Sequence, residues 1–76
     1  MDNEKIKNII ADALGLDNVN DDNSMENTEE WDSLGHLSIL SAIDRELDGK
    51  ASEINDLANA SSVKQIINIL KKNNLI

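Results

Sequence analysis

Residues 30–37 read EWDSLGHL and divide the chain into two unlike parts. Before them lies a segment rich in Asp, Asn and Ser, which compete with a helix by hydrogen bonding to their own backbone. After them the chain is rich in Leu and Ile. We therefore predict that a long loop ends at this stretch and that a helix begins there.

Residues 33–47 have the apolar spacing of that helix. Ile39, Ile43 and Leu47 recur every four residues, with Leu40 and Ala42 beside them, and predict its core-facing side.

Leu34 and Leu37 fall on another side of the same predicted helix, so its apolar arc is wider than one buried stripe requires. Two interpretations stay open. In the first, these side chains form a docking surface, since exposed apolar groups often mark one. In the second, they pack beneath the preceding loop.

Asp32 and Ser33 can each cap the start of this helix. With Asp32 as the cap, its carboxylate accepts from the backbone N–H of Leu34 or Gly35, and Ser33 takes the first helical position with a free hydroxyl. A phosphate ester there would lie at the positive end of the helix dipole. With Ser33 as the cap, the serine has only a structural role.

Residues 4–14 place apolar side chains at i, i+3, i+4, i+7 and i+8, the spacing of an amphipathic helix. Asp2 or Asn3 can cap its start, and Gly15 can end it in the left-handed conformation.

Two more helical segments are predicted towards the end of the chain. Ser52 can cap a short helix over about 53–58, which offers Ile54 and Leu57 to the core. Ser62 has capping-box spacing with Gln65 and precedes the apolar series Val63, Ile66, Ile67 and Leu70.

These segments predict an all-α fold, a small antiparallel bundle of three main helices plus one short helix. A long acidic loop joins the first two helices, and Leu16, Val19 and Met25 are spaced to anchor it to the core.

Charge and composition exclude several classes of function. The formal net charge is −8, and residues 8–44 contain nine acids but no Lys or Arg. Such a field repels nucleic acid and anionic lipid and attracts basic protein surfaces. The alternative is that the net charge simply keeps a small protein soluble. With no long apolar run and no basic-then-apolar start, we expect a cytoplasmic protein with no signal peptide and no membrane span.

No catalytic or metal site is predicted. Asp32, Ser33 and His36 have the residue types of a hydrolase triad. However, three residues on one helical turn point outward and do not converge on a substrate, so we predict no triad. We expect His36 to be partly buried beside Leu40 and Ile43, or to be a surface group near Ser33. One His and no Cys leave little to hold a metal ion.

The chain resembles the acyl carrier protein family over essentially its whole length. The resemblance lies in Asp32-Ser33-Leu34, in the acidic loop before it, the Ile/Leu-rich helix after it and the Ser62-Val63 start of the last helix. That family attaches 4′-phosphopantetheine to the serine of an Asp-Ser-Leu motif at the start of its second helix. The resemblance implies a single carrier domain over residues 1–76, modified on Ser33, which is a substrate of enzymes and not an enzyme itself.

The resemblance also implies partners. A phosphopantetheinyl transferase would modify Ser33 from coenzyme A, and enzymes that load and transfer acyl or aminoacyl groups would use the arm's thioester. We expect a monomer whose partners present basic surfaces to Glu29, Glu30, Leu34, Leu37, Asp44 and Glu46.

The chain departs from the family in places. Many fatty-acid carriers have a bulky apolar side chain at the position of Ser41. Acidic residues are also more frequent in them at the positions of Gly35 and Ser38. Gly35-His36 looks like carriers of specialised pathways, whereas peptidyl carriers usually show Gly-Gly-His/Asp-Ser around the serine. The preferred interpretation is a free-standing carrier outside primary lipid synthesis. The alternative is an acidic helical interaction module without a cofactor.

Overall fold

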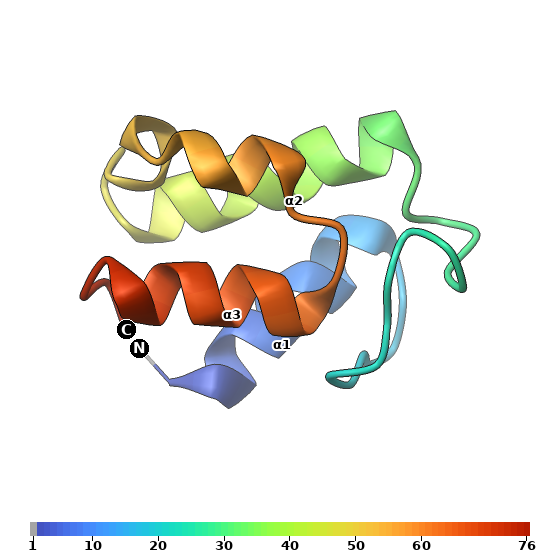
Figure 1. Cartoon of the computed structure of the whole chain (residues 1–76). Coiled ribbons are helices and arrows are strands. Elements are labelled where there is room, and N and C mark those ends of the chain that lie inside the picture. The colour runs from blue at the N-terminus through green and yellow to red at the C-terminus, as the bar shows by residue number, and fades with distance from the viewer. Residues whose placement is uncertain (1) are drawn as a thin grey trace.

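The computed structural model describes residues 2–76, which form three α-helices, two short 3₁₀ helices and no strand. The predicted all-α class is therefore confirmed. In Figure 1, α2 and α3 run in the same direction across the view, and α1 runs against them. No helix within these residues is long and apolar enough to cross a membrane. In chain order the elements are α1 (Asn3–Leu14), α2 (Ser33–Glu46), η1 (Ala51–Glu53), η2 (Asn55–Asn59) and α3 (Val63–Lys72).

Both ends of α1 are set by local backbone chemistry. The Asp2 carboxylate accepts from the backbone N–H of Lys5 at 2.9 Å, so Asp2 is the cap and Asn3 is already helical. Gly15 ends the helix with φ of 74°, a left-handed conformation that glycine adopts without a steric penalty.

The core gathers side chains from all three α-helices. Short helices such as these are marginal alone in water and depend on the burial of an apolar face against one another. The largest side chains with almost no exposed surface are Ile6, Ile10, Trp31, Ile39, Ile43, Leu57, Val63, Ile66 and Leu70.

The segment after α2 differs from the single capped helix that we expected over residues 53–58. It forms two 3₁₀ turns, η1 and η2, because the backbone at Ile54 is extended (φ −101°, ψ 101°) and separates them. Ser52 lies inside η1 and caps nothing. Its N–H donates to Asp44 Oδ1 and its hydroxyl donates to the Gly49 carbonyl, both at 2.8 Å.

Residues 15–32 contain no helix, and their acidic side chains are exposed. Of the three predicted anchors, Val19 is buried and Leu16 half-buried, but Met25 is exposed. The prediction for Met25 is wrong because the backbone holds the loop there. Its N–H donates to the Ser61 carbonyl at 2.9 Å and forms part of a short antiparallel contact with the start of α3.

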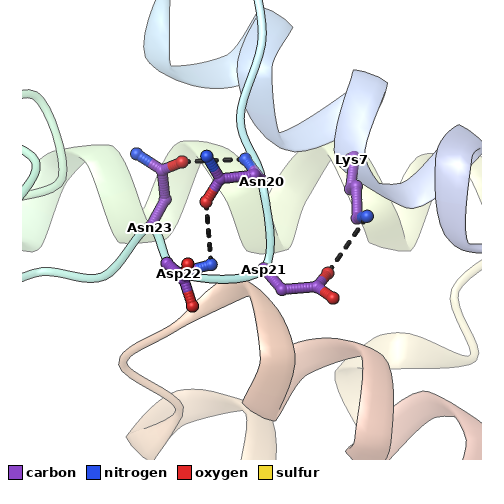
Figure 2. Close-up of polar contacts among 5 residues, drawn as sticks. All are labelled: Lys7, Asn20, Asp21, Asp22 and Asn23. Carbon is purple, nitrogen blue, oxygen red and sulfur yellow. Dashed lines mark hydrogen bonds and ion pairs between the residues drawn. The ribbon is translucent and has the colours of Figure 1, made fainter.

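Side chains within the loop fix its shape (Figure 2). The Asn20 N–H donates to Asn23 Oδ1, and the Asp22 N–H donates to Asn20 Oδ1, both at 2.8 Å. Lys7 of α1 forms an ion pair with Asp21 at 3.1 Å, and this hydrogen bond raises the pKa of Lys7. Asn and Asp are therefore used here as turn formers, and one ion pair joins the loop to α1.

The start of α3 has half of the predicted capping box. Ser62 Oγ accepts from the Gln65 N–H at 3.1 Å, as a cap should. The Gln65 side chain returns one residue earlier than expected and accepts from the Ser61 N–H at 2.7 Å.

Candidate functional site

Asp32 is the cap of α2, and Ser33 is its first helical residue. Asp32 has an extended backbone, and its Oδ1 accepts from the Gly35 N–H at 2.8 Å. Ser33 is exposed. The alternative in which Ser33 caps the helix is therefore wrong, and its hydroxyl is free of that task.

Leu34 and Leu37 stand in water beside this serine. Their exposed fractions are 74% and 60%, so the alternative in which they pack beneath the loop is also wrong. Met25 is the other large apolar side chain that is exposed within residues 2–76. Large apolar groups held in solvent on a regular helix are what a docking surface requires.

Ser33 also lies at the edge of a shallow, mostly apolar hollow of about 390 Å³. On the α2 side its wall includes His36, Leu37 and Leu40, and Met25 adds to the lining. The facing wall is formed by Ala58, Asn59 and Ala60, at the end of η2.

A second hollow adjoins the first and shares the lining residues Leu40 and Ala58 with it. It lies between α2 and the η1–η2 segment and includes Asp44, Ser52 and Ile54. We call these two adjoining hollows the groove; Ser33 lines the first of them and Asp44 the second.

The acidic residues predicted to bind partners are divided between two sides. Glu29 and Glu30 are exposed in the loop that leads to Ser33. Asp44 is half-buried and lines the groove. Glu46 is exposed on the flank of α2 that faces α1, where it lines a separate hollow with Asp12. The structure therefore brings Asp44 to the groove on the Ser33 side and leaves Glu46 outside it.

His36 and Trp31 form a buried pair that the sequence did not reveal. Trp31 Nε1–H donates to His36 Nδ1 at 3.0 Å, and His36 Nε2 lies 2.9 Å from the Leu57 carbonyl oxygen. The indole is only a donor and the carbonyl only an acceptor. Both contacts are satisfied by the neutral imidazole that carries its proton on Nε2.

The alternative that placed His36 at the surface is therefore wrong, because the residue is only 8% exposed. Trp31 and His36 are five positions apart and lie across a helix start, where no hydrophobic periodicity applies. The one available signal was chemical, since a buried indole N–H needs an acceptor.

Gly35 makes this packing possible. A Cβ at Gly35 would lie 2.4 Å from the Glu30 carbonyl oxygen and 3.0 Å from Leu14 Cδ2. Only glycine lets the loop backbone approach the first turn of α2 so closely. The structure thus explains the Gly35-His36 pair. Gly35 leaves room for the loop backbone, and His36 accepts the hydrogen bond of Trp31 in that loop.

The side chains near Ser33 are committed to structure. The Asp32 carboxylate caps α2, and both ring nitrogens of His36 have other partners, so neither forms a triad with Ser33. Within residues 2–76, no three His, Cys, Asp or Glu side chains gather closely enough to hold a metal ion. What the site offers is one accessible hydroxyl at a helix start, beside an apolar groove and exposed leucines.

Comparisons of this chain with protein-family models, with curated proteins and with solved structures gave no match.

Proposed function

We propose that this protein is an acyl carrier whose Ser33 bears a 4′-phosphopantetheine arm. The main support is the position of Ser33, exposed in the first turn of α2 while Asp32 serves as the cap. A serine that caps a helix has its hydroxyl occupied, whereas this one is available to a modifying enzyme. The Asp32-Ser33-Leu34 motif and its resemblance to the carrier family supply the identity of the arm.

The electrostatics of the helix start favour a phosphodiester on Ser33. The first N–H groups of a helix have no partner within the helix, and its dipole places positive charge there. Asp32 uses one of these donors, the N–H of Gly35. Its negative charge would repel the phosphate, but at an exposed position salt and solvent screen that repulsion.

The attachment step balances as a phosphoryl transfer from coenzyme A. Ser33 Oγ forms a bond to the phosphorus of the phosphopantetheinyl group, and the bond from that phosphorus to adenosine 3′,5′-bisphosphate breaks. The hydroxyl proton leaves to a base of the transferase. Once bound, the arm supplies a terminal thiol that holds an acyl or aminoacyl group as a thioester.

Charge and exposed leucines define the surface that we assign to partner enzymes. Glu29 and Glu30 lead to Ser33, Leu34 and Leu37 stand beside it, and Asp44 lines the groove. Basic enzyme surfaces complement this acidic approach. Glu46 lies outside this surface, on the α1 flank of α2.

The proposal includes the remaining family features. These are the antiparallel bundle with its long acidic loop, a monomeric state, a cytoplasmic location and a place in specialised biosynthesis. The last of these rests on Gly35, Ser38 and Ser41, where α2 is less acidic and less apolar than the second helix of many fatty-acid carriers.

The test is incubation with coenzyme A and a broad-specificity phosphopantetheinyl transferase, followed by intact mass spectrometry. Wild type and Ser38→Ala, a control at an exposed serine of the same helix, should each gain one phosphopantetheinyl group. Ser33→Ala should gain none. An acidic interaction module without a cofactor would gain nothing in any of the three forms, and a gain by Ser33→Ala would place the arm elsewhere.

A further inference from the structure

His36 holds together the two segments that flank Ser33. We propose that it is a positioning residue for the modification of Ser33, acting through Trp31 and Leu57. This inference rests on the proposed function. We call the three residues and their two hydrogen bonds the histidine link.

The histidine link ties α2 to a different segment on each side. Trp31 belongs to the loop that leads into Ser33, and Leu57 belongs to η2. Trp31 and Leu57 are 1% and 2% exposed, and the imidazole hydrogen-bonds to the indole of the first and to the backbone carbonyl of the second. Both hydrogen bonds are therefore sheltered from water, which makes each one costly to lose.

The two tied segments are also the surroundings of the candidate site. The loop residues Glu29 and Glu30 immediately precede Trp31. Ala58 and Asn59 follow Leu57 and form the wall of the hollow that faces Ser33. A change in His36 would therefore move both the acidic approach to Ser33 and the far wall of its hollow.

His36 acts on Ser33 only through these segments. It follows Ser33 by three residues, about one helical turn, and its ring nitrogens bond to Trp31 and Leu57. Gly35 supports the same arrangement, because a side chain there would push away the Glu30 backbone. The site thus has a polar support of its own, the two hydrogen bonds of His36 to Trp31 and Leu57, which are themselves core residues.

The expected consequence is a change in how well a transferase recognises the protein. Ser33 keeps its hydroxyl and Asp32 keeps its capping bond when His36 is replaced, so the chemical step should change little. The docking surface loses its fixed shape, so binding should weaken.

The experiment measures kcat and KM for phosphopantetheine transfer, with the carrier protein as the varied substrate. His36→Leu removes both hydrogen bonds with little change in volume and should raise KM at least tenfold, with kcat within about twofold of wild type. His36→Gln, which offers one acceptor and one donor, should recover much of the loss. Trp31→Phe removes a single donor and should raise KM by a smaller factor.

Leu70→Val is the matched control for stability alone. Leu70 is fully buried near the C-terminal end of α3, and Figure 1 shows that end far from the start of α2. It should lower the thermal midpoint and leave both kinetic constants unchanged, at a temperature where every variant is folded.

The outcomes separate the two proposals. If wild type is modified and His36→Leu and Trp31→Phe have the KM of the Leu70→Val control, the positioning role is wrong and the carrier function stands. The positioning role is also wrong if His36→Gln raises KM as much as His36→Leu does. If folded wild type is never modified, both proposals fail together. If His36→Leu does not fold, the KM values of Trp31→Phe and Leu70→Val are compared instead. A higher KM for Trp31→Phe supports the positioning role, and equal values contradict it.

Discussion

The packed face between α1 and α3 and the N-terminal end of α2 use similar side chains in opposite ways. Ile10 of α1 and Leu70 of α3 have no exposed surface. Leu34 and Leu37 of α2 expose 74% and 60% of theirs. The first region gains stability by removing apolar groups from water. The second region lacks that gain, and the proposed docking of partner enzymes on its leucines would supply it only when a partner binds.

The two regions are also held in place by different forces. The packed face depends on volume, because its isoleucines and leucines fill one core. The start of α2 depends on polar contacts and on one close backbone approach, through Asp32, His36 and Gly35. Substitutions should therefore fail for different reasons in the two regions.

The largest effect should come from the core. Ile10→Ala should lower the free energy of unfolding by about 2–5 kcal/mol, through lost burial and a residual cavity. Leu37→Ala should change it by no more than about 0.5 kcal/mol, since that side chain is already in water. Urea unfolding followed by the fluorescence of Trp31 measures both. Equal losses would remove the distinction between the two regions.

The second largest loss of stability should come from Gly35→Ala. The added methyl group would meet the Glu30 carbonyl oxygen at 2.4 Å, and relieving that overlap costs about 1–3 kcal/mol. The gain in helix propensity offsets at most about 1 kcal/mol of it. Thermal unfolding should show net destabilisation. A higher thermal midpoint for Gly35→Ala would mean that the loop does not pack against α2 as described.

A smaller loss is expected from Asp32→Ala, about 1 kcal/mol, because the Gly35 N–H loses its acceptor. Asp32→Asn is the control, since Asn caps helices about as well as Asp. Thermal midpoints compare the three proteins. If Asn is as harmful as Ala, charge and not capping explains the role of Asp32.

The smallest effect should come from the ion pair between Lys7 and Asp21, which lies apart from both regions. The hydrogen bond to Asp21 raises the pKa of Lys7, so the folded state holds this proton more tightly than the unfolded state. Its stabilisation is complete below pH 10.5 and is lost as the pH rises through the higher folded pKa.

Lys7→Gln should therefore lower the thermal midpoint slightly at neutral pH, and less than Asp32→Ala does, because ion pairs at the protein surface contribute little. The difference from wild type should vanish in strongly alkaline buffer. A difference that grows with pH would reverse the assigned sign.

The helices were predictable because their ends carry strong local signals. Ser62 caps a helix and Gly15 ends one, as the sequence indicated, and Asp2 and Asp32 are each one of the two cap candidates that the sequence left open. The chemistry of capping depends on residues three or four positions apart, so it can be read along the chain. The same logic predicted that Ser33 would be free once Asp32 took the cap.

What the sequence did not reveal depends on contacts between distant segments. His36 meets Leu57 across 21 positions, and Met25 meets Ser61 through backbone atoms that carry no residue signature. Gly35 was noticed only as a family variation, since its reason is the approach of the Glu30 carbonyl. Such contacts are tertiary, and periodicity along one helix contains no information about them.

The most direct test of the central claim is the intact mass of the protein purified from a host that has a broad-specificity transferase. Wild type should carry one phosphopantetheinyl group, and Ser33→Ala from the same host should have its unmodified mass. Any further mass on the thiol of the wild-type arm would identify the cargo. A wild-type protein that is folded yet unmodified, even after added transferase and coenzyme A, would contradict the carrier function.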